Sequence, residues 1–81
     1  MDKSEIRAAV LTTIKGIAPE IDENELRRDQ PLRDQVDLDS MDWLNVIIGL
    51  HGRLRVDIPE SDYAKLTTLD AIVEYLAAKL S

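Results

Sequence analysis

The chain of 81 residues contains no cysteine, and it has only three prolines and three glycines. Without cysteine the chain can form no disulfide, no thiolate zinc site and no cysteine nucleophile, so any thiol chemistry must come from a group added to it. No apolar run approaches the roughly 18 residues of a membrane-spanning helix, and the first residues lack the apolar stretch of a signal peptide. We therefore expect a protein without a membrane span that resides in the cytoplasm.

Positive charge is scarce as well. Ten lysines and arginines stand against 16 aspartates and glutamates, so the formal net charge is -6 and the pI is about 4.6. Phosphate backbones are poor partners for such a surface, and we expect no nucleic-acid partner. Hydrophobic residues make up 44% of the chain, which is enough for it to fold, and the length leaves room for one small core. The sequence thus predicts one domain over residues 1–81 that acts as a monomer.

Apolar residues at helical spacing predict three longer helices. The first spans residues 3–17, the second runs from residue 40 to about 54, and the third follows a capping-box-like sequence at residues 67–70. A short fourth helix fits within residues 60–66, and no pattern of a β-hairpin competes with these elements. The sequence therefore predicts an all-α fold, a four-helix bundle of three longer helices and one short helix.

A long connection, residues 20–39, separates the first two longer helices. Loops of this length are uncommon in so small a domain unless they are functional or packed. The connection can hold a helical turn near Asn24 to Arg28. Five apolar residues along it are expected to hold it against the core: Ile21, Leu26, Leu32, Val36 and Leu38.

The second longer helix carries a capping signal and two glycines. Asp39 is placed as its N-cap, because its carboxylate can accept a hydrogen bond from an unpaired first-turn amide. Gly49 and Gly52 each cost about 1 kcal/mol relative to alanine in a helix interior. Their presence indicates either close packing or local looseness, and the sequence leaves both open.

The negative charge is concentrated in the segment from residue 20 to residue 42. This segment holds nine acidic residues and three arginines, so it accounts for the whole net charge and the rest of the chain is neutral. One interpretation is a solvated loop, and the other is an acidic docking face for a basic partner.

Neither a metal site nor a catalytic group is predicted within this acidic segment. A calcium loop beginning at Asp37 would match only one of four further template positions. Ser40 lacks the glycines of a nucleophile elbow, and the one histidine, His51, lies roughly 16 Å further along the predicted helix. We expect no metal ion and no catalytic residues, and hence a protein that is not an enzyme.

The sequence Asp39-Ser40-Met41, followed by Asp42 at the head of the second longer helix, resembles the acyl carrier protein family. The resemblance extends to Val56-Asp57-Ile58-Pro59, which stands where the family has an Ile-Pro turn. It implies that a phosphopantetheinyl transferase joins 4′-phosphopantetheine covalently to Ser40, with Asp39 as the helix cap beside the attachment site. The thiol of that arm would then carry acyl groups as thioesters, and the protein would be a non-catalytic carrier.

Family membership also implies partner enzymes. Acyl-loading and acyl-processing enzymes with basic docking faces would contact the acidic segment and the exposed side of the second longer helix. The alternative for Leu44 and Ile48 is a place in the core. The residues expected at this interface are Asp37, Asp39, Met41, Asp42, Leu44 and Ile48.

Two departures from the family pattern bear on the pathway and the cargo. The second longer helix lacks the acids that the fatty-acid-synthesis branch keeps further along it, which favours a specialised fatty acid, lipid or polyketide-type pathway. Trp43 stands where the family has a smaller residue beside its acyl cavity, so we expect its indole to fill that space. The alternatives are an aminoacyl or peptidyl carrier and an unmodified acidic four-helix interaction module.

Overall fold

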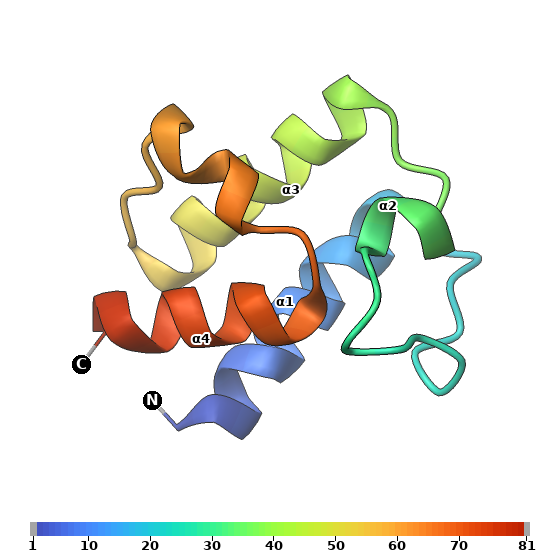
Figure 1. The fold of residues 1–81 in the computed structure, drawn as a ribbon, viewed down its shortest axis with the longest axis horizontal. Helices are drawn as coiled ribbons and strands as arrows, with labels where there is room; N and C mark the ends of the chain where they lie inside the picture. Colours follow the sequence, from blue (N-terminus) through green and yellow to red (C-terminus); the bar gives the residue numbers. More distant parts are fainter. Residues whose placement is uncertain (1, 81) are drawn as a thin grey trace.

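The computed structural model describes residues 2–80, and this part of the chain contains helices and no strand (Figure 1). The four α-helices of this part are α1 (Lys3–Ile17), α2 (Leu32–Gln35), α3 (Ser40–Leu54) and α4 (Leu69–Leu80). A 3₁₀-helix, η1 (Glu60–Lys65), lies between α3 and α4. The all-α prediction is confirmed, with two refinements: the short helix is a 3₁₀-helix, and the one-turn α2 is an addition.

Helix α1 packs against both α3 and α4, and the core lies where the three meet (Figure 1). Each helix turns one apolar side toward the other two, as the helical spacing predicts. No helix within residues 2–80 is both long enough and apolar enough to cross a membrane. The nine large side chains that are almost fully buried are Ile6, Val10, Ile14, Leu32, Val46, Leu50, Leu69, Ile72 and Leu76.

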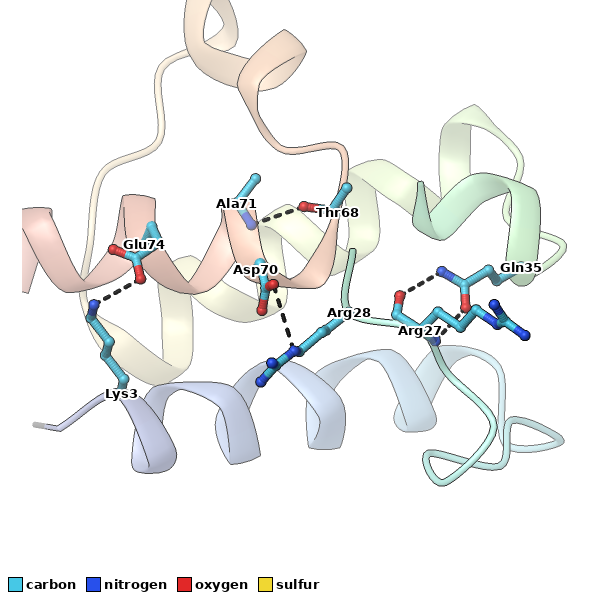
Figure 2. Close-up of polar contacts among 8 residues, drawn as sticks. All are labelled: Lys3, Arg27, Arg28, Gln35, Thr68, Asp70, Ala71 and Glu74. Carbon is cyan, nitrogen blue, oxygen red and sulfur yellow. Dashed lines mark hydrogen bonds and ion pairs between the residues drawn. The ribbon is translucent and has the colours of Figure 1, made fainter. Parts of the chain in front are cut away.

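The N-terminus of α4 is capped one residue later than the sequence pattern predicts. The amide of Ala71 donates a hydrogen bond of 3.0 Å to the hydroxyl of Thr68, so Thr68 is the capping residue and the predicted box at residues 67–70 is wrong (Figure 2). Asp70 instead contacts the long connection. Its amide donates to the carbonyl of Arg28 at 3.0 Å, and its carboxylate lies 3.8 Å from the guanidinium of the same residue.

The long connection is held in place by apolar burial and by one side chain. Gln35 accepts a hydrogen bond from the amide of Arg27 at 2.6 Å and donates one to its carbonyl at 2.8 Å (Figure 2). Around Asn24 the chain makes a hydrogen-bonded turn, which falls short of a helix. The predicted packing of the apolar residues is confirmed, because Leu32, Val36 and Leu38 are buried and Ile21 and Leu26 are partly buried.

The two glycines of α3 have different surroundings. A Cβ atom built on Gly49 would lie 2.7 Å from the methyl carbon of Thr13 on α1, whereas one on Gly52 would meet no atom within 4 Å. Thr13 is itself buried, and its hydroxyl donates to the carbonyl of Ala9 at 2.8 Å. Gly49 therefore allows α1 and α3 to approach closely, whereas the packing around Gly52 does not require a glycine.

We predict opposite effects for alanine at the two positions. Gly49→Ala gains about 1 kcal/mol of helix propensity but forces apart a packed crossing, which costs about 1–3 kcal/mol. Its free energy of unfolding should therefore fall. Gly52→Ala should gain about 0.5–1 kcal/mol, because the helix gains alanine and nothing is displaced. Urea unfolding of both variants checks this, and a Gly49→Ala protein as stable as Gly52→Ala would contradict the close crossing.

Candidate functional site

The first turn of α3 is organised by Asp39. Its backbone is extended, with φ -79 and ψ -178, and its carboxylate accepts a hydrogen bond of 2.8 Å from the amide of Asp42. Its carbonyl accepts the first helical hydrogen bond, from the amide of Trp43 at 2.9 Å. This is the geometry of an N-cap, so the prediction for Asp39 is confirmed. Ser40 thereby becomes the first residue of the helix.

The hydroxyl of Ser40 is available for modification. The residue is exposed, and within residues 2–80 its hydroxyl takes part in no hydrogen bond. The amides of Ser40 and Met41 have no helical partner, because they precede the first residue that can reach a carbonyl four positions back. Such amides, with the positive end of the helix dipole, favour a phosphate group by about 0.3–1 kcal/mol. A phosphate ester on Ser40 therefore fits the local backbone.

Three carboxylates lie within three residues of Ser40 in the sequence. Asp37 and Asp39 are exposed and Asp42 is half-buried, and none of them joins an ion pair within the part of the chain that the structure describes. They oppose an added anion by Coulomb repulsion, which water and salt screen in part. They also make this end of α3 attractive to a basic surface.

An apolar stripe runs along α3 from the same end. It consists of Met41, Leu44 and Ile48, whose side chains are 74%, 45% and 57% exposed, and which recur at helical spacing. The interpretation of Leu44 and Ile48 as core residues is therefore wrong. Val46 and Leu50, on the other side of α3, are fully buried. The helix thus has one side in the core and a second apolar side open to solvent.

Two hollows lie beside α3, between it and η1. The near hollow, of about 200 Å³, is lined by Trp43 together with Pro31, Arg33, Tyr63, Ala64, Leu66 and Thr67. The far groove, of about 530 Å³, is lined by Ile47, Ile48, His51, Asp57, Ile58, Pro59, Tyr63 and Lys79. Trp43 is half-buried and packs against the core. Its indole lines the near hollow and does not fill it. Tyr63 lines both the near hollow and the far groove. Its spacing from Leu66 in the sequence does not by itself predict this position.

His51 lies at the other end of α3 and has a local role. Its Nδ1 atom is 2.9 Å from the carbonyl oxygen of Val56 and 3.6 Å from the carboxylate of Asp57. Arg55, with a φ of 52, ends the helix in the left-handed conformation. His51 is exposed, and it ties the end of α3 to the segment after it. Within residues 2–80 no group of three side chains is placed to hold a metal ion.

A hydrogen bond fastens η1 to α4. The hydroxyl of Tyr75 donates to the carboxylate of Asp62 at 2.6 Å, and the ammonium group of Lys65 lies 3.3 Å from the same carboxylate. The hydrogen bond from Tyr75 is the main cause that holds the pKa of Asp62 below its usual value of 3.8. Burial, and then the hydrogen bond to Asp62, raises the pKa of Tyr75 from 10.0 to about 12. None of the residues of η1 is fully buried, and this contact joins η1 to α4 in addition to the packing of Tyr63 against the core.

Comparison with known proteins identifies a match over most of the chain. The family model described as a phosphopantetheine attachment site matches residues 8–76. The chain is 26% identical over 78 residues to Acyl carrier protein 2, mitochondrial, of Arabidopsis thaliana, a match that covers 96% of this chain and 61% of the plant protein. It is 29% identical over 79 residues to an acyl carrier protein of Rubrobacter xylanophilus, covering 94% and 93% of the two chains.

The fold has a counterpart among solved structures. The solution structure of a candidate acyl carrier protein from Anaplasma phagocytophilum superposes with a TM-score of 0.87. The two sequences are 31% identical, and the superposition covers 100% of this chain and 94% of the other. Sequence and structure comparisons therefore lead to the same family.

We predict that Tyr75→Phe lowers the melting temperature by a few degrees, because it removes the hydrogen bond that anchors η1. The stability that this hydrogen bond contributes depends on pH, and it is lost in acid and in alkali. The lowered pKa of Asp62 means that its contribution is present above pH 3.8 and is lost as pH falls through the folded-state value. The raised pKa of Tyr75 means that its contribution is complete below pH 10.0 and is lost as pH rises toward about 12.

The difference in melting temperature between wild type and Tyr75→Phe should thus be largest between about pH 5 and pH 9. Tyr63→Phe is the matched control, because within residues 2–80 the hydroxyl of Tyr63 takes part in no hydrogen bond. A difference for Tyr75→Phe that stayed constant from pH 3 to pH 11 would count against the Asp62 contact.

Proposed function

Because the chain belongs to the family with a phosphopantetheine attachment site, we propose that Ser40 bears the 4′-phosphopantetheine arm of an acyl carrier. Members of this family are non-catalytic carriers with a covalently attached arm, and this chain is one of them. The arm supplies a thiol that holds acyl groups as thioesters. The observation that carries the choice of Ser40 is its free, exposed hydroxyl at the capped start of α3.

The chain's own residues prepare the attachment site without activating it. Asp39 fixes where the helix begins, and the open amides of Ser40 and Met41 face the phosphate that an ester at Ser40 would place there. No imidazole lies near the hydroxyl, since His51 is roughly 16 Å along α3, and within residues 2–80 no carboxylate is hydrogen-bonded to it. The transferase must therefore take the proton of Ser40 as its oxygen bonds to the phosphorus atom that bears the pantetheine of coenzyme A and the diphosphate bond breaks. Adenosine 3′,5′-bisphosphate leaves.

The acidic end of α3 and its apolar stripe are suited to partner enzymes. Asp37, Asp39 and Asp42 would attract a basic surface, and Met41, Leu44 and Ile48 would be covered by the partner. Charged groups at the rim of an interface mainly speed association, whereas a buried apolar centre slows dissociation. The proposed partners are the phosphopantetheinyl transferase and the acyl-loading and acyl-processing enzymes.

We place the carrier in a specialised fatty acid, lipid or polyketide-type pathway. Beyond its first turn, α3 and its C-cap carry Asn45, His51, Arg53 and Arg55, all exposed and none acidic. A partner that requires negative charge along the whole helix would find it only around Ser40. The cytoplasmic location stays a prediction, since one of the similar proteins is mitochondrial.

Ser40→Ala should abolish attachment of the arm. Wild-type protein incubated with coenzyme A, magnesium and a broad-specificity phosphopantetheinyl transferase should gain the mass of one phosphopantetheine, and Ser40→Ala should gain none. Ser61→Ala is the matched control, because Ser61 is also exposed but lies on η1, and it should be modified like wild type. A modified Ser40→Ala protein would sink the proposal.

Met41→Glu should lower the kcat/KM of partner enzymes by about tenfold, which corresponds to the loss of one apolar anchor worth roughly 1.4 kcal/mol. Met41 is 74% exposed and takes no part in the core, so helicity by circular dichroism should not change. Ala8→Glu adds the same charge at an exposed position on α1 and should leave turnover intact. Equal turnover of all three proteins would remove Met41 from the interface.

A further inference from the structure

The exposed side of α3 continues beyond the apolar stripe to the end of the helix. Met41, Leu44 and Ile48 are followed on the same side by Gly52 and Arg55, since all five recur at spacings of three or four residues. All five residues are exposed. We propose that this side of α3 is a dimer interface, on which a second copy of the chain binds with its own α3 antiparallel. The proposal does not depend on the arm, and it replaces the monomer expected from the sequence.

Charges of opposite sign lie unpaired at the two ends of α3. The carboxylates of Asp37, Asp39 and Asp42 lie at its start, and Arg53 and Arg55 lie at its end. None of the five joins an ion pair within residues 2–80. An antiparallel pair places the acidic start of each helix beside the basic end of the other, whereas a parallel pair places like charges together. The charges therefore select a second copy in the antiparallel direction.

One carboxylate lies near the basic end of α3. Asp57 has a side chain that is 96% exposed, and its carboxylate oxygen is 3.6 Å from the Nδ1 atom of His51. Arg53 and Arg55 outnumber this carboxylate, so the end of α3 keeps a positive charge. Protonation of His51 adds to that charge.

The exposed side of α3 matches itself in one register. In a two-fold pair each contact occurs twice, so a side chain and the residue opposite it must fit at both places. When Ile48 meets Ile48 of the second copy, Leu44 lies opposite Gly52 and Met41 lies opposite Arg55. A Cβ atom built on Gly52 would meet no atom within 4 Å, so nothing on this side of α3 keeps a facing leucine away. The register gives a role to Gly52, a glycine that packing within the chain does not require.

The interface is small, so the dimer should be weak. A helix of 15 residues is about 22 Å long and presents a side about 10 Å wide. This area is well below the roughly 800 Å² per partner that a stable dimer buries. The net charge of -6 on each copy adds repulsion, which salt at about 0.15 M screens beyond about 8 Å. Partner enzymes of the proposed function use the same stripe and would therefore displace the second copy.

Sedimentation equilibrium of the unmodified chain tests the dimer. This form has neither cysteine nor arm, so no disulfide can produce a dimer. In about 0.15 M salt the weight-average mass should rise from 9.1 kDa at about 10 μM toward twice that value near 1 mM. Amide shifts in NMR spectra should change on dilution within residues 41–55 and not within α1. A mass of 9.1 kDa at every concentration would overturn the proposal, and so would dilution shifts on α1 instead of α3.

Charge reversal tests the antiparallel direction. Arg55→Glu should raise the Kd of the dimer by about tenfold, because the acidic start of one helix then meets an acid. Asp42→Arg should do the same, and an equimolar mixture of the two variants should dimerise again, because the two changed ends meet each other. Arg7→Glu is the matched control, because Arg7 is exposed on α1 and its substitution changes the net charge equally. A mixture that does not dimerise would contradict the antiparallel pair.

Gly52→Gln separates association from folding. Glutamine is a good helix former, so helicity and the melting temperature of dilute protein should not fall. Its side chain fills the space opposite Leu44, so the dimer should be lost. A dimer of Gly52→Gln as strong as that of wild type would place the contact elsewhere and overturn the proposal.

The dimer and the proposed function can fail separately, because none of these measurements uses the arm. Attachment to Ser40 is read from the mass spectrum, whatever the oligomeric state. A chain that stays monomeric, and whose turnover by partner enzymes still falls in Met41→Glu, would assign the stripe to those enzymes alone and overturn the dimer.

Discussion

The carboxylate of Asp39 accepts the amide of Asp42, and this hydrogen bond determines the residue at which α3 begins. Successive residues of a helix are about 100° apart around its axis, so the residue at which α3 begins determines where Ser40 and the open amides of the first turn lie. With the start fixed, Val46 and Leu50 face the core, while Met41, Leu44 and Ile48 face solvent. The cap thus places Ser40 at the head of α3, and the burial of Val46 and Leu50 leaves the apolar stripe facing solvent.

The charges around the start of α3 bear on which groups the carrier supplies and which its partner enzymes supply. Carboxylates at Asp37, Asp39 and Asp42 oppose a phosphate on Ser40, and within residues 2–80 none of them is hydrogen-bonded to the hydroxyl. In the proposed function they attract basic enzymes, so the partner would bring the reactive groups and the carrier would supply an exposed attachment point. A protein without cysteine gains its thiol in the same way, from the arm.

The sequence alone predicted the elements that depend on local patterns. Helical periodicity located α1 and α3, and the residue type at position 39 located the cap. It missed α2, because that single turn is held by the side chain of Gln35 on the backbone of Arg27, eight residues away. The sequence pattern predicted the cap of α4 one residue too early, because Thr67 and Thr68 are chemically equivalent. The contacts of Asp70 with Arg28 lie outside the local pattern.

The features that could not be predicted from the sequence depend on which residues pack against α3. Periodicity marks Leu44 and Ile48 as apolar but does not say whether the connection before α3 covers them, and the structure leaves them exposed. Gly49 and Gly52 look alike in sequence and differ only in that Thr13 lies against the first. Tyr63 lines two hollows, and η1, which carries it, is bonded to α4 through Asp62 and Tyr75, 13 positions apart.

The most direct test of the account is to locate the arm within the protein after modification by a phosphopantetheinyl transferase. Cleavage after arginine and lysine releases the peptide of residues 34–53, in which Ser40 is the one serine and which contains no threonine or tyrosine. Tandem mass spectrometry should find the whole added mass on this peptide, at Ser40. An arm on any other peptide, or a folded protein that accepts none, would contradict the assignment of the start of α3 as the attachment site.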